Sequence, residues 1–300
     1  MPVGWHPLQI RGGDRPLDDG VRRRILEVAA AEESQSGRRP FSEGLRAALH
    51  SRDDAADWLW LDPPGRAYAG RQHGPTAPVV EITADPGSPA AGPELLRRLT
   101  AELPGALLWT HGDRSAGRCS AELVGLRKLR ELWLMVGDPG TTGIAADTAP
   151  PEGVLLRDFD PATDVGAWLA LNREAFTDLA DQASWTEADL RQRLDSDWFD
   201  PHGFIVAERD GRLVGFHWTK VDPGAGFSGR PSGEVYVLAV AAEQRGGGLA
   251  RALLHAGLEH LRASGLRSVH LFVDADNSPA IGLYGAAGFR HRDSDRQYTW

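Results

Sequence analysis

Cysteine is almost absent from this sequence, in which Cys119 is the only one among 300 residues. A single thiol cannot form an intrachain disulfide, which favours a reducing compartment and therefore a cytoplasmic protein. We expect Cys119 to be a small buried hydrophobic residue rather than a reactive thiol. No window approaches about 18 uncharged apolar residues, so we expect no membrane-spanning helix. The N-terminus lacks a signal-peptide pattern as well.

Positive charge is also in deficit. The formal net charge is −9 at pH 7, which argues against broad binding of nucleic acid or of an anionic membrane surface. The histidines show neither an HExxH motif nor paired ligand spacing, so we expect no metal. What the chain does have is 41% hydrophobic residues, enough for packed cores. Its length favours two domains of about 100–200 residues each.

The chain contains one segment that is typical of an interdomain linker, rich in Gly, Pro, Ala and Thr, at residues 141–152. The same order of expected elements stands on both sides of it. Each side has a hairpin, a strand, a glycine-containing loop leading into a helix, another strand, a short helix and a final strand. We therefore predict that one domain was duplicated, which gives domains at 1–140 and 153–300.

The second half holds three consecutive glycines, Gly246–Gly248, between an expected strand and an amphipathic helix. Glycine allows unusual backbone dihedrals and lets a ligand approach the chain closely. The first turn of the helix, from Leu249 onward, has free N–H groups and the positive end of the helix dipole, which together bind phosphate well. Arg245 and Arg251 can add positive charge. The pattern is neither GxGxxG nor a P-loop, and an ordinary glycine-rich loop is the alternative.

The motifs around this loop resemble the GNAT acetyltransferase superfamily. The match consists of Arg-x-x-Gly-x-Ala after a strand, Asn-x-x-Ala at a helix start and Tyr-x-x-x-Gly-Phe, and it covers Val154 to Trp300. The resemblance implies an α/β (α+β) fold of two tandem domains, each a mixed, mostly antiparallel sheet flanked by helices. It also implies that acetyl-CoA, the cosubstrate, is bound by Leu238, Ala239, Val240, Arg245, Gly246, Gly247, Gly248, Leu249, Ala250, Arg251, Asn277 and Ala280.

Two such units in one chain are similar to the mycothiol synthase family, on the segments "GFHWTKV", "GEVYVLAV" and "LFVDADNSPAIGLYGAAGF". This resemblance implies acetyl-CoA-dependent N-acetylation of the cysteinyl amine of cysteinyl-glucosaminyl-inositol, the last step of mycothiol biosynthesis. The expected partners are therefore acetyl-CoA and a small-molecule amine, and we expect a monomer. Two alternatives stay open. One is a GNAT N-acetyltransferase for another small primary amine or amino-acid conjugate, and the other is a regulatory module that binds acetyl-CoA.

Amine acetylation needs a base that removes a proton from the substrate ammonium and an acid that protonates the leaving thiolate. By the family resemblance, the base is Glu234, at the start of the strand that contacts acetyl-CoA. Period-two alternation predicts that Glu234 shares a face with Tyr236 and Leu238. The acid is Tyr284 of the "LYGAAGF" motif. The alternatives are a strand-end glutamate facing solvent and an aromatic residue of the core.

The family resemblance also implies substrate contacts at Glu43, Asp181, Lys220, Glu234 and Phe272. The sequence departs from the family at two of these positions. Asp181 stands where the family has a glutamate, and Phe272 stands where a tyrosine hydroxyl contacts substrate, so the exact amine stays open. For Lys220 and Glu43, solvated surface positions are the alternative.

The first domain departs furthest from the family pattern. Its loop, "ADPGSPAAGPELLRRL", lacks Arg-x-x-Gly-x-Gly/Ala. Pro86, Pro89 and Pro93 have no N–H to offer to a phosphate, and the predicted base and acid have no counterparts. We predict a degenerate, catalytically silent GNAT domain, and whether it binds acetyl-CoA is left open.

Overall fold

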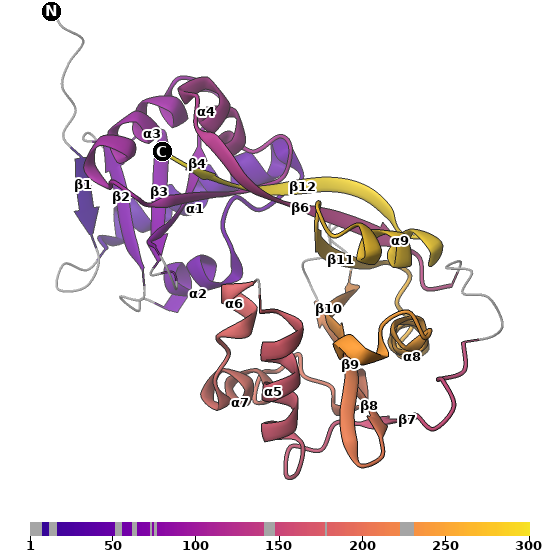
Figure 1. Ribbon diagram of the computed structural model, residues 1–300. Coiled ribbons are helices and arrows are strands. Elements are labelled where there is room, and N and C mark those ends of the chain that lie inside the picture. The colour runs from indigo at the N-terminus through magenta and orange to yellow at the C-terminus, as the bar shows by residue number, and fades with distance from the viewer. Residues whose placement is uncertain are drawn as a thin grey trace, which may run out of the picture. The chain divides into compact units, whose positions relative to one another are not determined.

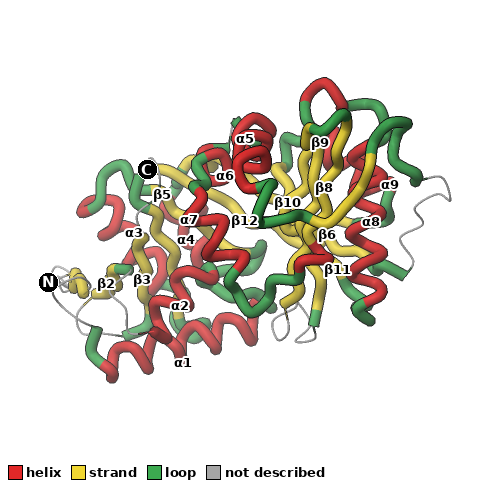
Figure 2. The backbone as a smooth tube through the Cα atoms, turned by 90° about the horizontal axis from the view of Figure 1, so that it is seen from below, coloured by secondary structure: helices red, strands yellow, loops and turns green. Residues whose placement is uncertain are grey.

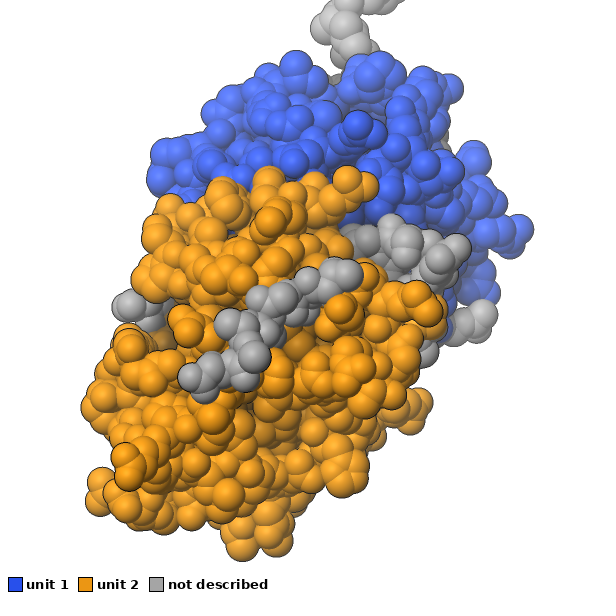
Figure 3. Space-filling view, turned by 90° about the vertical axis from the view of Figure 1, so that its right-hand side faces the viewer, with its two compact units in different colours: residues 1–132, 293–300 blue, residues 133–292 orange. Residues whose placement is uncertain are grey.

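The computed structural model describes residues 8–11, 17–51, 56–61, 65–72, 74, 77–140, 148–177, 179–222 and 231–300. The chain divides into two compact units, which Figure 3 distinguishes by colour. Unit 1 comprises residues 1–132 and 293–300, and unit 2 comprises residues 133–292. None of the helices in the described ranges has the length and the apolar character that crossing a membrane requires.

Unit 1 is a mixed sheet with helices packed on it (Figure 1 and Figure 2). Its strands lie in the order β1-β2-β3-β4-β5-β12-β6. The pair β4 and β5 is parallel, whereas β1 to β4 follow one another in antiparallel pairs. Its elements are β1 (Leu8–Arg11), α1 (Asp19–Ser36), α2 (Glu43–Ser51), β2 (Asp57–Leu61), β3 (Ala67–Gln72), β4 (Val79–Ala84), α3 (Ala91–Glu102), β5 (Leu107–His111), α4 (Ala116–Val124), the first part of β6 (Arg127–Gly137) and the last part of β12 (Arg290–Thr299).

Helices cover both faces of the sheet of unit 1, because apolar side chains alternate along its strands. On β2, Trp58 and Trp60 join a core with residues of α1 and α2. Leu59, between them, joins a separate core with residues of α3 and α4. The hairpin expected in the first half of the chain is therefore confirmed as β2 and β3, with one core on each side.

Unit 2 repeats this plan with strands in the order β6-β11-β10-β9-β8-β7. One core contains residues of α5 and α7, and a second contains residues of α8 and α9. The N-cap of α7 is Thr186, which forms a reciprocal capping box with Asp189. The elements are β7 (Leu155–Asp158), α5 (Val165–Ala175), α6 (Ala180–Ala183), α7 (Glu187–Leu194), η1 (Pro201–Gly203), β8 (Phe204–Arg209), β9 (Arg212–Asp222), β10 (Ser232–Val240), η2 (Ala242–Gln244), α8 (Leu249–Ala263), β11 (Val269–Asp274) and α9 (Ser278–Ala286).

The boundaries of the compact units differ from the expected domains 1–140 and 153–300. The last strand of the second repeat, β12, pairs antiparallel with β5 through Asp295–Thr299. From Asp293 onward it therefore belongs to unit 1. The last strand of the first repeat, β6, belongs to unit 2 from Trp133 onward. Each unit thus takes a strand segment from the other repeat, because β12 lies between β5 and β6. The proposed linker, 141–152, separates the repeats of the sequence rather than the compact units.

The expectation that Cys119 is buried is wrong. Cys119 is exposed on α4, whose buried face is formed by Gly117, Ser120 and Ala121. A helix of this length presents only one stripe to the core, and position 119 lies outside it.

A buried charged network joins β12 to the rest of unit 1. The ring of His111 lies between two carboxylates, with Nδ1 3.0 Å from Asp295 Oδ2 and Nε2 3.2 Å from Glu81 Oε2. Asp295 also accepts a hydrogen bond from Arg38 Nη2 at 2.7 Å. Burial lowers the pKa of His111, but the carboxylates of Glu81 and Asp295 outweigh burial and raise that pKa to about 9.

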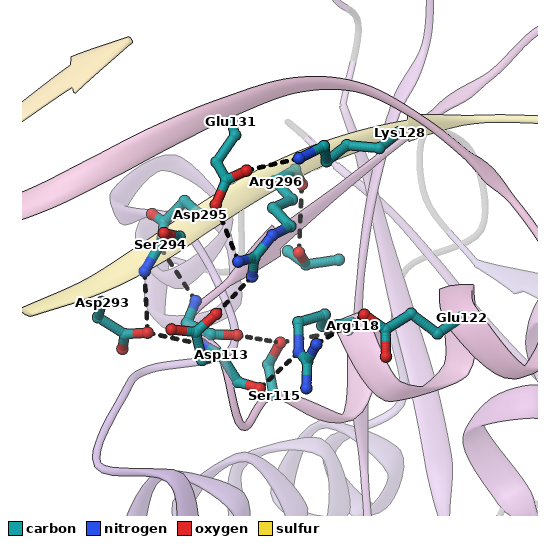
Figure 4. Close-up of polar contacts among 12 residues, drawn as sticks. Asp113, Ser115, Arg118, Glu122, Lys128, Glu131, Asp293, Ser294, Asp295 and Arg296 are labelled. Atoms are coloured by element: carbon teal, nitrogen blue, oxygen red, sulfur yellow. Dashed lines mark hydrogen bonds and ion pairs between the residues drawn. The ribbon is translucent and has the colours of Figure 1, made fainter. Parts of the chain in front are cut away.

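The next residue of β12, Arg296, forms further ion pairs that are only partly buried. Arg296 donates to Asp113 Oδ1 at 2.6 Å and to Glu131 Oε1 at 2.9 Å (Figure 4). Both networks lie between β12 and segments of the first repeat, so β12 is held in unit 1 by charge as well as by its ladder.

We expect unit 1 to lose stability as the pH rises from about 6.5 to 9. A histidine in an unfolded chain has a pKa of about 6.5, whereas folded His111 has a pKa of about 9. The folded state therefore binds more protons in this window. The stabilisation that is fully present below the unfolded pKa is lost as the pH rises through the folded pKa, by on the order of 3 kcal/mol. Urea unfolding at a series of pH values measures this slope. The His111→Gln variant should flatten it, whereas exposed His50→Gln should not, and equal slopes in all three proteins would contradict the assignment.

Candidate functional site

Unit 2 contains a cavity of about 540 Å³ where the end of β10 meets the first turns of α8 and α9. Every predicted acetyl-CoA contact lines this cavity except Gly247 and Leu249. The side chain of Leu249 is 1% exposed and belongs to the core, so only its backbone could contact a ligand. The structure thus brings together residues from three segments that the sequence separates.

The cavity lies where two parallel strands separate. β10 and β11 pair only at their beginnings, through Gly233 with Val269 and Glu234 with His270. In the described residues, β10 and β11 are not paired beyond these two positions, so the backbone groups of β10 that face β11 have no partner on that strand. Buried backbone N–H and C=O groups need partners. The end of the strand, Leu238–Val240, is therefore suited to bind an extended ligand through its backbone.

The loop before α8 is shaped to bind an anion. Gly246 and Gly248 have φ values of 80° and 89°, in the left-handed region that residues with a Cβ rarely adopt. Gly248 is the N-cap of α8 and has no side chain that could satisfy the first amides of the helix. Arg245 and Arg251 line the same cavity. Free amides, the helix dipole and two guanidinium groups together fit a diphosphate.

Tyr284 is the predicted acid, and it lies in the wall of this cavity. Its side chain is 7% exposed, and its ring packs edge-on against Phe289 with the centroids 5.9 Å apart. Burial raises the pKa of the Tyr284 phenol well above its usual value. The hydroxyl therefore stays protonated at neutral pH and can donate a proton.

The predicted base, Glu234, does not share a face with Leu238, and that part of the prediction is wrong. Glu234 lies opposite Lys220 of β9, and Leu238 lies opposite His217. Lys220 and His217 are three residues apart on a strand, so they point to opposite faces. The cause is a bulge between Val235 and Val237 that shifts the register.

Tyr236, the bulged residue, remains near Glu234. The Nζ of Lys220, whose strand position faces Glu234, lies 5.6 Å from the centre of the Tyr236 ring and 4.9 Å from that of Trp198. Because of the bulge, Glu234, Lys220 and Tyr236 lie close to one another, whereas Leu238 points to the opposite face of the sheet.

Glu234 also has a histidine beside it on the next strand. His270 Nε2 lies 3.8 Å from Glu234 Oε2, and His270 Nδ1 lies 3.3 Å from Ser232 Oγ. The ring of Phe272 is 6.1 Å from that of His270, and this phenylalanine is 37% exposed. Lys220 and Phe272 are thus placed on either side of Glu234, through β9 and β11. Glu234 itself does not line the cavity that contains Tyr284.

Two predicted substrate contacts, Glu43 and Asp181, lie on helices whose described residues do not line this cavity. Glu43 is the first residue of α2 in unit 1 and is exposed. The side chain of Asp181, in α6, lies outside the described residues.

Sequence reasoning missed some of the wall of the cavity. Phe176 and Ala175, at the end of α5, line it, although their helical spacing assigns them to the apolar stripe of that helix. Phe176 is the C-cap residue, and no local pattern distinguishes a C-cap side chain that turns toward a ligand from one that packs in the core. Gln244, Pro279 and Leu283 also line the cavity, and each directly precedes or follows a predicted contact or Tyr284.

Comparison with known proteins defines the family. The model of the Acetyltransferase (GNAT) family matches residues 167–289. Mycothiol acetyltransferase from Thermobispora bispora is 42% identical and covers 93% of this chain and 96% of its own length. The same-named protein from Arthrobacter sp. is 38% identical and covers 99% of this chain and 97% of its own length. This chain belongs to the mycothiol acetyltransferase family. It is therefore an acetyl-CoA-dependent N-acetyltransferase, as predicted, and not only a binding module.

Solved structures confirm the predicted fold of tandem GNAT domains. A GCN5-related N-acetyltransferase from Sphaerobacter thermophilus superposes with a TM-score of 0.67 at 21% identity, covering 97% of this chain and 94% of its own. A tandem GNAT protein from the clavulanic acid biosynthesis pathway superposes with a TM-score of 0.63 at 18% identity, covering 97% and 98%. At these identities the likeness concerns the fold alone.

We expect Gly248→Ala to weaken acetyl-CoA binding, whereas Gly265→Ala should leave it unchanged. Both glycines have positive φ, of 89° and 80°, and both stand in open space next to an end of α8. An alanine at either position should therefore cost about 1–2 kcal/mol of stability. Only Gly248 lines the cavity, so only its distortion should move the amides of the loop. Calorimetric titration measures the difference, and equal affinities in the two variants would argue against the loop as the anion site.

Proposed function

We propose that unit 2 transfers the acetyl group of acetyl-CoA to the cysteinyl amine of cysteinyl-glucosaminyl-inositol, which yields mycothiol in the last step of its biosynthesis. The observation that carries the proposal is the cavity in which the uncapped start of α8 and the buried hydroxyl of Tyr284 come together. The substrate is taken from relatives named mycothiol acetyltransferase, which match nearly the whole chain. A cytoplasmic monomer that binds neither nucleic acid nor membrane stays our prediction.

We place acetyl-CoA in the cavity with its diphosphate at the glycine loop and its pantetheine arm along the end of β10. Its diphosphate would accept hydrogen bonds from the amides of Gly246–Gly248 and of the first turn of α8, with Arg245 and Arg251 alongside. Its pantetheine arm, which has amide groups of its own, would pair with the backbone of Leu238–Val240. Asn277 accepts a hydrogen bond from Ala280 N–H at 3.1 Å, and this cap fixes the start of α9 at the cavity wall.

Glu234 is our proposed base. The substrate amine arrives mostly as ammonium, and only the neutral amine is nucleophilic. The carboxylate of Glu234 would take this proton directly or through one water molecule, with His270 3.8 Å away as a neighbouring polar group. The amine would then attack the thioester carbonyl directly, without an acyl-enzyme intermediate.

Tyr284 is our proposed acid. As the carbon–sulfur bond of the thioester breaks, negative charge develops on sulfur. A phenol held in its protonated form by burial can donate its proton to that thiolate.

The remaining substrate contacts follow the family. The carboxylates of Glu43 and Asp181 suit an ammonium or hydroxyl donors, and the ammonium of Lys220 suits hydroxyl acceptors. Phe272 presents an exposed apolar ring where the family has a hydroxyl. This last observation favours a second candidate, an N-acetyltransferase of the same fold for a less polar amine.

The experiment that tests the substrate compares cysteinyl-glucosaminyl-inositol with a panel of other small amines and amino-acid conjugates. CoA release should show the highest kcat/KM for the cysteinyl compound. In the Glu234→Gln variant, turnover should be lost or shifted to alkaline pH, where more of the amine is already neutral. The control Glu259→Gln, at a half-exposed position of α8, should behave as the wild type. A higher kcat/KM for another amine would support the second candidate instead.

We expect Tyr284→Phe to lower kcat by about 100- to 10,000-fold, because it removes the proton donor and little packing volume. KM for acetyl-CoA should change little, since the ring remains. Steady-state kinetics measures both constants. Tyr298→Phe, at a buried tyrosine of unit 1, is the matched control. Wild-type turnover in Tyr284→Phe would remove Tyr284 from the mechanism.

A further inference from the structure

The central strand ends in the same turn in both units, which allows their clefts to be compared. The turn from Asp85 in unit 1 and the turn from Ala241 in unit 2 each have a hydrogen bond from the fourth residue to the first carbonyl, at 2.8 and 3.0 Å. Ala84, which ends β4, is therefore the counterpart of Val240, which ends β10. Val240 is one of the residues proposed to bind acetyl-CoA through its backbone.

In unit 1 a side chain occupies this position. The carboxylate of Glu32, from α1, accepts hydrogen bonds at Oε2 from the Ala84 N–H at 3.0 Å and from the Thr83 hydroxyl at 2.8 Å. Its Oε1 accepts from the N–H of Ala116 at 2.8 Å, and Ala116 is the first residue of α4. Glu32 is 3% exposed. A single buried carboxylate thus satisfies the end of the strand and the start of the following helix.

The gap between β4 and β5 holds further buried charge. The two strands pair only through Val79 and Val80 of β4, as β10 and β11 pair only at their beginnings. Beyond that point, Glu81 and His111 form an ion pair across the gap at 3.2 Å. The counterpart of Glu81 in unit 2, three residues before the strand end, is Val237. Unit 1 thus has charged side chains in this gap, whereas the matching position of unit 2 carries an apolar residue.

The loop that follows has few amides to offer to a diphosphate. Pro86, Pro89 and Pro93 have no N–H. The carboxylate of Asp85 accepts the N–H of Gly87 at 2.9 Å, so this donor is already used, and the carboxylate itself would repel a phosphate.

We infer that unit 1 binds no acetyl-CoA, because Glu32 occupies the amide of Ala84, whose counterpart in unit 2 is proposed to bind the coenzyme, and because Asp85 and three prolines leave the following loop few free amides. The comparison rests on the function proposed for unit 2. A cavity of about 490 Å³ remains beside Glu32. Asp85 and Asp113 also line it, and of its two arginines Arg118 is bonded to Glu122 at 2.6 Å. The remaining space is therefore poorly suited to a polyanion.

Alkylation of Cys119 tests this inference in the full-length protein. Cys119 is the only cysteine, is exposed and lines the remaining cavity of unit 1. Its rate of modification by iodoacetamide, followed by mass spectrometry, should be the same with and without saturating acetyl-CoA. Slower modification in the presence of acetyl-CoA would overturn the inference.

Calorimetric titration with acetyl-CoA gives an independent count of sites. We expect one site per chain in the wild type, and none in a variant with both Arg245→Glu and Arg251→Glu. Two sites, or a site that survives this double substitution and protects Cys119, would overturn the inference. If the wild-type chain binds no acetyl-CoA at all, the function proposed for unit 2 is contradicted, whereas the inference that unit 1 binds none still holds.

The role of Glu32 itself is tested by Glu32→Ala. Without the carboxylate, the amides of Ala84 and Ala116 lose their acceptor, so the start of α4 should loosen and Cys119, on the same helix, should react faster. The melting temperature should fall as well. Glu33→Ala is the matched control, because it removes the same charge from the same helix at an exposed position. Equal alkylation rates and melting temperatures in the two variants would contradict the role of Glu32.

Discussion

When two parallel strands separate within a sheet, the backbone groups that face the gap lose their ladder partners, and a folded protein must supply others. Both units of this chain have such a gap, at β4 and β5 and at β10 and β11. Unit 2 leaves the end of its strand next to a cavity, where we propose that the pantetheine arm of acetyl-CoA binds. Unit 1 fills the same position with Glu32. The same backbone requirement is therefore met in two ways, by a cavity in unit 2 and by a buried carboxylate in unit 1.

The difference between the units extends from the strand into the loop. In unit 2 the glycine loop provides amides and is followed by a helix without a side-chain cap. In unit 1 proline removes amides and an aspartate binds one that remains. A carboxylate supplied by the chain is always present, so unit 1 has its structure whether or not a coenzyme is available. In the function proposed for unit 2, the corresponding donors gain partners only when the coenzyme binds, and binding then offsets the cost of leaving them without partners.

Much of this site could be predicted because its signals are local. The left-handed glycines, the helix start at Leu249 and the spacing to Tyr284 depend on residues close together in sequence, and the structure places them around one cavity. What could not be predicted depends on pairing between distant segments. A bulge that turns Leu238 away from Glu234 shows only in the register with β9. Glu32 is an ordinary glutamate of a polar helix until α1 is seen to pack on β4. The exposure of Cys119 likewise follows from which side of α4 packs against the sheet.

The position of β12 has a consequence for how this protein is made. A domain usually folds as soon as its own residues have left the ribosome. Unit 1 cannot do so, because residues 293–300 belong to it and follow all of unit 2 in the chain. Until residues 293–300 have been synthesised, β5 has an unpaired edge, and Arg38 and His111 lack their ion pairs with the carboxylate of Asp295. The nascent first repeat must therefore remain incomplete while the second is translated, which makes the two halves one unit of biosynthesis although each has the same order of elements.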